Sequence, residues 1–265
     1  NILNLLAYLQ IDLQGYDFSN LTIRQAHLQG VSLAGTNFQD SSFDKSVFAT
    51  TFRGIFEIAL SSGENKKLLA TSHADSQIRL WQIADGKNLL TLKAHQGWAF
   101  GLAFSPDGEI LASGGHDNLV KLWDVQTGEC LQTLDKHIAP VWCVRFSPDG
   151  KILATCSSDN SIRLWDVHSG KCLKIFQKHA KCVISVAFST DGSTLVSGSR
   201  DGDVRLWDIA TGKCIQTLTD NQDFVRSAAF SPNGKILAVV GGFNEHTVRI
   251  WDIEEGRCIQ KLHGH

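Results

Sequence analysis

Three histidines stand at matched distances from a hydroxyl residue and an aspartate. The sets are His95, Ser113 and Asp117; His137, Thr155 and Asp159; and His179, Ser197 and Asp201. Histidine, serine and aspartate are the groups of a nucleophilic triad, in which the histidine takes the proton of the serine hydroxyl. A triad is needed once, beside an oxyanion hole, whereas this set recurs in three successive segments. The recurrence favours polar groups that satisfy one another in the interior, and we expect no catalytic residue among them.

Tryptophans mark the same period along most of the chain. They are spaced 42, 42, 42 and 44 residues apart, and the last four are each followed by aspartate: Trp81, Trp123, Trp165, Trp207 and Trp251. A self-similarity of about 40 to 45 residues with Trp-Asp at the end of an apolar run is typical of β-propeller blades. Most of the chain therefore resembles the WD-repeat family. The resemblance implies that Trp123, Trp165 and Trp207 complete a structural hydrogen-bond chain with the three sets above.

Each repeat carries the chemistry of a four-stranded meander. In the second repeat, apolar stretches at 99–105, 110–114, 120–125 and 130–134 are separated by turns. The first turn, Ser105-Pro106-Asp107-Gly108, combines a proline that presets φ with a glycine that accepts a positive φ. One meander cannot bury both of its faces, so neighbouring blades must stack on it. We predict an all-β fold with a WD-repeat propeller over 53–265, in which five blades are visible and the ring is incomplete.

Two repeats depart from the pattern. The first has Thr71, Asp75 and Trp81, but no histidine ahead of its first strand. The fifth has Asn221 in place of the histidine, Glu245 in place of the turn aspartate, and a two-residue insertion. Because a half-satisfied polar network stabilises less than a complete one, we expect the fifth blade to open more easily than blades two to four.

The N-terminal part of the chain has a different period. Apolar residues recur at every fifth position: Leu13, Phe18, Ile23, Leu28, Leu33, Phe38, Phe43 and Phe48. This spacing matches neither the period of a helix nor that of a strand. It resembles the pentapeptide-repeat family, which implies a short right-handed β-solenoid of two coils over 11–52. Residues 1–10 are predicted as the end of an upstream helix or as a cap.

The order of helix, pentads and propeller resembles the sensor region of bacterial, especially cyanobacterial, NB-ARC and WD-repeat signal-transduction NTPases. That resemblance implies an upstream nucleotide-binding domain, and the remaining blades, elsewhere in the full-length chain. The sequence itself has no GxxxxGK[ST] phosphate loop, so no nucleotide hydrolysis is expected here.

Composition argues against several classes of partner. A net charge of −2 leaves no basic footprint for nucleic acid or an anionic membrane, and no apolar stretch approaches the roughly 20 residues that span a bilayer. The seven cysteines lack the close spacing of zinc ligands, and four fill one repeat position: Cys130, Cys172, Cys214 and Cys258. We expect reduced thiols that fill small apolar spaces, no cofactor, no metal, and a cytoplasmic location.

Two further tryptophans are not required by the repeat. Trp98 and Trp142 lie where the chain enters the innermost strand, which in WD-repeat proteins is the top rim around the central channel. Aromatic and arginine side chains are common anchors of protein interfaces. The predicted partner-binding residues are Trp98, Phe100, His116, Trp142, Arg200, Phe224 and Arg226. Phe100 and Trp142 are also in phase with core residues, so packing between blades is the alternative for these two.

These features predict a non-catalytic protein-interaction scaffold or sensor module of a larger signalling protein, with a protein or peptide partner on the top face. One alternative is a propeller enzyme that uses the central channel, for which Glu57 and Arg145 are the unusual charges of the first strands. The other is a purely structural repeat array, which a propeller that retains no protein from a lysate would favour.

Overall fold

The computed structural model describes residues 13, 15–24, 36–37, 39–44, 54–61, 67–219, 224–241 and 247–263. Contacts within the chain divide it into two units, Asn1–Phe52 and Arg53–His265. Every regular element in these residues is a β-strand. Over the same ranges there is no helix that could cross a membrane. The helix or cap predicted at 1–10 lies outside the described residues.

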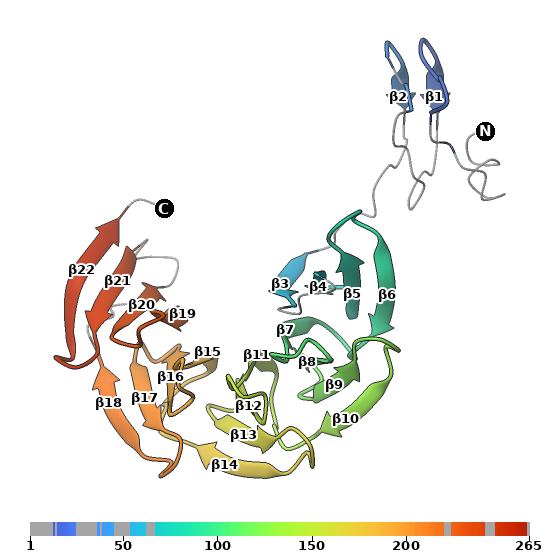
Figure 1. Cartoon of the computed structure of the whole chain (residues 1–265). Helices are drawn as coiled ribbons and strands as arrows, with labels where there is room; N and C mark the ends of the chain where they lie inside the picture. The colour runs from blue at the N-terminus through green and yellow to red at the C-terminus, as the bar shows by residue number, and fades with distance from the viewer. Residues whose placement is uncertain are drawn as a thin grey trace. The chain divides into compact units, whose positions relative to one another are not determined.

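The second unit consists of five antiparallel four-stranded sheets, which we call blades one to five in chain order (Figure 1). Blade one contains β3 (Ile55–Leu60), β4 (Leu68–His73), β5 (Gln77–Gln82) and β6 (Asn88–Lys93). Blade two contains β7 (Ala99–Phe104), β8 (Ile110–Gly115), β9 (Val120–Asp124) and β10 (Cys130–Leu134). Blade three contains β11 (Val141–Phe146), β12 (Ile152–Ser157), β13 (Ile162–Asp166) and β14 (Cys172–Phe176). Blade four contains β15 (Val183–Phe188), β16 (Thr194–Ser199), β17 (Val204–Asp208) and β18 (Cys214–Leu218). Blade five contains β19 (Val225–Phe230), β20 (Ile236–Gly241), β21 (Thr247–Asp252) and β22 (Arg257–His263). The fold is therefore all-β with WD-type blades, as predicted.

The turn after the first strand of blades two to five is closed by its own side chains. In blade two, Asp107 Oδ1 lies 2.5 Å from Ser105 Oγ, and that hydroxyl accepts a hydrogen bond from the Ile110 amide at 2.9 Å. Gly108 has a φ of 77°, a conformation that other residues rarely adopt. The same turn in blade three gives Gly150 a φ of 73°. Serine, aspartate and glycine at these positions thus fix the register of the first two strands.

The blades stack side by side with their first strands innermost. Figure 1 shows β7, β11 and β15 toward the inside of an arc and β10, β14 and β18 along its outer rim. The core lies between blades: Ala103, Ala112, Val120, Leu122 and Leu134 of blade two pack against Val141, Val144, Leu153, Trp165 and Val167 of blade three. Inner strands approach closely, because a Cβ on Gly101 would lie 2.9 Å from the Cα of Cys143.

The two ends of the arc each leave an apolar face uncovered. On blade one, Ile58 is 60% exposed and Leu60 is 64% exposed, whereas Val144, which occupies the matching place in blade three, is fully buried. On blade five, Leu262 is 44% exposed, whereas its counterpart Leu134 in blade two is 4% exposed. These faces have the composition of an interblade core but no neighbouring blade within the described residues.

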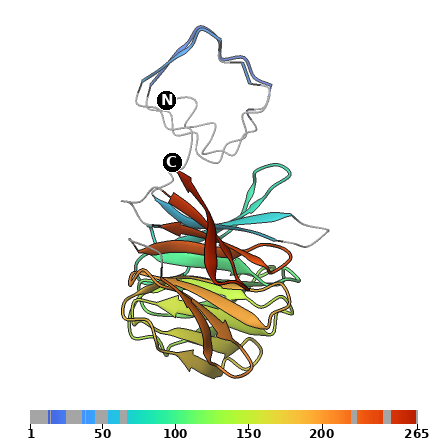
Figure 2. The ribbon, with the colours of Figure 1, turned by 90° about the vertical axis from the view of Figure 1, so that its left-hand side faces the viewer.

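The first unit contains two short parallel strands, β1 (Thr22–Arg24) and β2 (Ser42–Asp44). Their register pairs Thr22 with Ser42, so four five-residue steps separate neighbouring strands. Figure 2 views the pair so that β1 and β2 overlie one another. Leu13 and Ile23 are buried, at 0% and 4% exposure, whereas the predicted apolar positions 28, 33, 38 and 48 lie outside the described residues.

Small hydroxyl residues join the two levels of this unit. Thr36 Oγ1 donates to the carbonyl oxygen of Leu13 at 2.8 Å, and Ser41 Oγ donates to that of Phe18 at 2.6 Å. The backbone of Phe18 also donates to the carbonyl oxygen of Asn37 at 2.8 Å. These contacts give a physical reason for small polar residues two places before an apolar one. A short hydroxyl side chain at this position bonds directly to the backbone of the neighbouring level.

Candidate functional site

The histidine sets form buried hydrogen-bond chains rather than exposed triads. In blade three, His137 Nδ1 lies 2.8 Å from Asp159 Oδ2, and His137 Nε2 lies 2.8 Å from Thr155 Oγ1. Trp165 Nε1 donates to the same threonine hydroxyl at 2.8 Å. His137 and Thr155 are 4% and 0% exposed. A hydroxyl that is buried and held by two neighbours cannot meet a substrate, so this set stabilises the blade.

Blades two and four repeat this geometry. His95 Nδ1 lies 2.8 Å from Asp117, its Nε2 lies 2.8 Å from Ser113 Oγ, and Trp123 Nε1 donates to that hydroxyl at 2.9 Å. In blade four the corresponding distances, among His179, Asp201, Ser197 and Trp207, are 2.9, 2.7 and 2.8 Å. Burial lowers the pKa of His179, and its bond to Asp201 only partly opposes this.

Blade one forms a similar hydrogen-bond chain, but its histidine comes from the second strand. His73 is fully buried at the end of β4, and its Nε2 lies 2.7 Å from Thr71 Oγ1, which accepts a hydrogen bond from Trp81 Nε1 at 2.9 Å. In blade two the matching position is Gly115, where a Cβ would lie 2.4 Å from the ring of His95. The space is therefore filled either by a histidine ahead of the first strand or by one within the second strand. The sequence carries this signal, because His73 is the only large side chain at its repeat position.

Blade five lacks the central hydroxyl of the chain. Val239 occupies the repeat position of Ser113 and Thr155, and it is fully buried. Trp251 Nε1 is buried and has no hydrogen-bond partner among the described residues. The substitutions predicted to weaken this blade, Asn221 and Glu245, lie outside the described residues. The valine is thus the clearest defect, and aligning the repeats at this position reveals it.

Replacing Val239 with threonine is expected to stabilise blade five, because the new hydroxyl would accept the hydrogen bond from Trp251 Nε1. One such bond contributes about 0.5–1.5 kcal/mol. In the unchanged chain, amides around Trp251 should exchange with solvent faster than those around Trp165. Hydrogen exchange followed by mass spectrometry should show slower exchange around Trp251 in Val239→Thr.

The matched control is Val186→Thr in blade four, because Val186 packs in the same core as Trp207, which already donates to Ser197 at 2.8 Å. A hydroxyl buried there has no unpaired indole N–H from which to accept a hydrogen bond, so it should destabilise the blade. Equal protection around Trp251 and Trp165 in the unchanged chain, or faster exchange in Val239→Thr, would contradict the assignment.

Aromatic side chains gather where the chain enters the inner strands. The Trp142 ring stacks on Phe100 with centroids 4.2 Å apart, and Trp98 contacts Phe100 and His116 at 6.0 Å each. Phe56 of blade one extends the cluster, because its ring lies 5.6 Å from Trp98. We call this surface, together with three neighbours, the mouth surface; its members are Phe56, Trp98, Phe100, His116, Trp142, Arg200, Phe224 and Arg226.

Arginines and half-buried aromatics complete the mouth surface. The guanidinium carbon of Arg200 lies 5.8 Å from the centre of the Trp142 ring. Trp142, Arg200, Phe224 and Arg226 all line one cavity of about 540 Å³, which inner strands of all five blades border. Trp142 Nε1 donates to Ser158 Oγ at 2.7 Å, so the indole orientation is fixed. Five of the predicted residues, including Phe100, therefore line one opening, and the other two, Trp98 and His116, contact Phe100.

Exposure distinguishes the residues that a partner can contact from the residues buried beneath them. Trp98 is 50% exposed and Phe56 is 42% exposed, whereas Phe100 is 4% exposed. His116, Arg200 and Arg226 are exposed. The predicted direct contact of Phe100 with a partner is therefore corrected: Phe100 lies beneath Trp98 and Trp142 and supports them. Phe56 belongs to the surface instead, because blade one has a neighbour on one side only.

The two unusual charges of the channel neutralise each other. Arg145 Nη2 lies 2.9 Å from Glu57 Oε1, although the two residues belong to blades three and one. Arg145 also crosses the backbone of β7, where Nη1 donates to the carbonyl oxygen of Leu102 at 3.3 Å. Within the described ranges, no group of three or more histidine, cysteine, aspartate or glutamate side chains has the arrangement of a metal site. Glu57 and Arg145 therefore have a structural explanation in each other.

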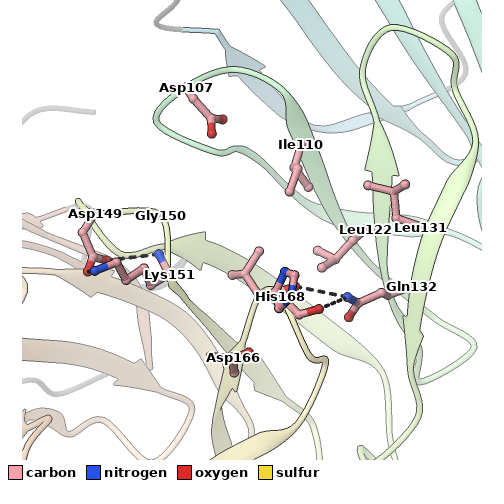
Figure 3. A pocket seen from close by; sticks show the side chains of 11 residues that line it. Asp107, Ile110, Leu122, Leu131, Gln132, Asp149, Gly150, Lys151, Asp166 and His168 are labelled. Carbon is pink, nitrogen blue, oxygen red and sulfur yellow. Dashed lines mark hydrogen bonds and ion pairs between the residues drawn. The ribbon is translucent and has the colours of Figure 1, made fainter.

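A second hollow lies at the opposite end of the strands, between blades two and three (Figure 3). Its volume is about 640 Å³, and it is lined by Asp107, Asp149, Lys151, Asp166 and His168 among others. Gln132 spans one wall by donating to the carbonyl oxygens of Val167 and His168 at 3.2 and 2.8 Å. We call it the interblade groove; its three carboxylates give it a charge opposite to that of the mouth surface.

The cysteines vary more than their shared repeat position predicts. All seven thiols are free. Cys172, Cys214 and Cys258 pack partly against the interblade cores, whereas Cys130 is exposed and does not fill an apolar space. Cys143 and Cys156 are buried opposite each other on β11 and β12. Burial raises the pKa of the Cys156 thiol well above its ordinary value.

The stacked four-stranded blades, of which blades one to four each have a Trp-centred hydrogen-bond chain, define a β-propeller repeat protein. The family of the WD domain, G-beta repeat, matches residues 86–124, 128–166, 170–208 and 212–252. These segments cover more than half of the chain, and the chain belongs to the WD-repeat family.

Named relatives match only parts of this chain. An uncharacterized WD repeat-containing protein of Nostoc sp. is 45% identical over 98 residues, which is 37% of this chain and 8% of that protein. The Lissencephaly-1 homolog of Caenorhabditis briggsae is 31% identical over 91 residues, 30% of this chain and 23% of that protein. Ribosome assembly protein 4 of Chaetomium thermophilum is 44% identical over 41 residues, 16% of this chain and 8% of that protein. The matched stretches span less than a quarter of each relative.

Proposed function

We infer that this chain is a non-catalytic protein-interaction module and that the mouth surface binds a protein or peptide partner. WD repeats in general form protein-interaction scaffolds, and their domains are typically not catalytic. The observation that carries the proposal is one aromatic cluster, in which exposed Trp98 contacts Phe100 and Phe100 stacks on half-buried Trp142. Trp142 and exposed Arg200 line the same cavity. Exposed aromatic and arginine side chains on a fixed scaffold are the usual anchors of interfaces.

The proposal extends to the setting of this module. A sensor role in a larger cytoplasmic signalling protein, with a nucleotide-binding domain upstream, is what the resemblance to NB-ARC and WD-repeat NTPases implies. The parallel pairing of β1 with β2 supports a pentapeptide-repeat spacer ahead of the propeller. The similarity to a WD-repeat protein of Nostoc sp. supports a cyanobacterial type of protein.

Trp98→Ala is expected to weaken binding of a protein partner at least about tenfold, since central aromatic anchors contribute about 2 kcal/mol or more. A photoreactive amino acid at position 98 should crosslink the partner from a lysate, and the purified partner is then titrated against the unchanged chain, Trp98→Ala and Arg226→Ala.

Leu173→Ala provides a matched control, because Leu173 is also 50% exposed but lies on the outer strand of blade three. Binding should be unchanged in this variant. If Trp98→Ala and Arg226→Ala bind every captured partner as the unchanged chain does, with the fold intact by circular dichroism, the mouth surface is not the site.

A further inference from the structure

Charge is distributed unevenly over the mouth surface. Three arginines and one glutamate line its cavity, although the whole chain has a net charge of −2. The glutamate, Glu57, is taken up by Arg145 at 2.9 Å. The two other arginines, Arg200 and Arg226, are exposed at the opening. Arg200 thus places a positive charge at the opening of an acidic chain, which favours a negative partner.

Arg200 is held in place by an aromatic ring rather than by a carboxylate. Its guanidinium lies over Trp142, and within the described residues no carboxylate forms an ion pair with it. The carboxylate of the adjacent Asp201 is bonded elsewhere, to His179 at 2.9 Å and to the Ala180 amide at 2.8 Å, and forms no ion pair with Arg200. A guanidinium stacked on a ring keeps its edge available for two parallel hydrogen bonds to a carboxylate.

An apolar platform surrounds this arginine. Trp142 is fixed by stacking on Phe100 and by its hydrogen bond to Ser158. Exposed Trp98 and Phe56 contact Phe100, so Phe100 joins the rings into one platform. A ligand that fits both features carries a carboxylate next to an apolar side chain. Such a pairing occurs in an acidic segment of a protein.

We propose that the mouth surface binds an acidic peptide segment, with a carboxylate of the segment on Arg200 and a neighbouring apolar side chain on the ring platform of Trp98 and Trp142. This inference rests on the proposed function and names the chemistry of its partner. A nucleic acid fits less well, because the interblade groove at the other end of the strands presents Asp107, Asp149 and Asp166, and phosphate binding relies on many basic contacts.

The test uses a short fluorescent peptide in which glutamates flank a central phenylalanine in a glycine–serine background. Versions with glutamine or lysine in place of glutamate, and a single-stranded oligonucleotide, are titrated in parallel by fluorescence anisotropy. The glutamate peptide should bind at least about tenfold more tightly than the glutamine peptide, because a charged hydrogen bond contributes more than about 1.5 kcal/mol. Its affinity should fall as salt rises.

Two variants of the full chain assign the effect to one residue. Arg200→Gln should remove the preference for glutamate over glutamine, and Arg200→Lys should retain part of it, because lysine keeps the charge but not the planar fork. Lys151→Gln is the matched control, since Lys151 is 80% exposed in the interblade groove and its loss should leave the preference intact. Thermal melts verify that each variant is folded.

The proposal is overturned if the glutamate peptide does not bind, if glutamine or lysine peptides bind as tightly, or if Arg200→Gln keeps the preference. An oligonucleotide that binds more tightly and loses affinity in Arg200→Gln would also overturn it. If Trp98→Ala weakens binding of the crosslinked partner but the peptides show no charge preference, the mouth surface still binds a partner. Only the proposal that this partner is acidic is then wrong. If binding of the partner and of the peptides depends on neither Trp98 nor Arg200, both the interaction surface and the acidic-segment proposal are wrong.

Discussion

Asp159→Ala should lower the free energy of unfolding by about 1–3 kcal/mol, because it leaves buried donors without an acceptor. Asp159 accepts from the Ser161 amide and hydroxyl at 2.9 and 2.6 Å, and it lies 2.8 Å from His137 Nδ1. Its side chain is 3% exposed. Urea denaturation of the variant and the unchanged chain measures the difference.

The control is Asp149→Ala in the turn after β11. Asp149 is also hydrogen-bonded, lying 2.6 Å from Ser147 Oγ, but its side chain is 57% exposed, so water replaces its contacts. Its loss should cost less, usually within about 0.5 kcal/mol for a surface site. If both variants are equally damaged, the roles of the two aspartates are wrongly assigned.

The cost of Asp159→Ala should also depend on pH. Burial raises the pKa of Asp159, but hydrogen bonds with His137 and Ser161 outweigh it and hold the pKa below its ordinary value. A carboxyl with a lowered folded pKa contributes stability that is complete above its unfolded pKa of about 3.9 and is lost as the pH falls toward the folded value. The difference between variant and unchanged chain should therefore shrink on acidification below about pH 4.

Self-association of the 265-residue chain is the second large effect that we expect. The uncovered face of blade one carries Ile58 and Leu60, and the uncovered face of blade five carries Leu262. These two faces have the residue types that meet at every interblade core, so blade five of one copy can stack on blade one of the next. Sedimentation velocity over a concentration series should show growing head-to-tail species.

Ile58→Asp should shift the distribution toward monomer, because it places a charge on the blade-one face. Leu173→Asp is the matched control, since Leu173 is similarly exposed but belongs to no interblade core within the described residues. A chain that stays monomeric at every concentration would show that the two faces do not join copies.

The propeller architecture is predictable because its determinants are local and repeated. Trp-Asp ends the third strand of blades two to five, and a turn that begins with serine and ends with glycine follows their first strand. Most positions in this register have the same kind of neighbour from blade to blade. The His–Ser/Thr–Trp contacts follow from that register in blades two to four. Handedness of the N-terminal solenoid and most of its pentads fall outside the described residues.

Departures from the repeat are harder to foresee, because they depend on what an adjacent blade supplies. His73 takes over a role assigned elsewhere to a residue before the first strand, since the blade-one slot is open to a side chain from β4. Phe56 and Phe100 occupy one repeat position, yet one is exposed and the other buried, because only Phe100 has Trp142 stacked on it. The difference between the two phenylalanines is not visible from residue type, whereas His73 stands out once the repeats are aligned.

The ion pair of Glu57 and Arg145 links blades that are not immediate neighbours. Blades that touch only their immediate neighbours behave as a linear array, in which each interface can loosen independently. Glu57 and Arg145 join blades one and three, 88 residues apart, and the arginine also binds the backbone of blade two. Blades one, two and three are thus linked across the inside of the arc, so we expect their relative orientation to be restrained by more than face-to-face stacking.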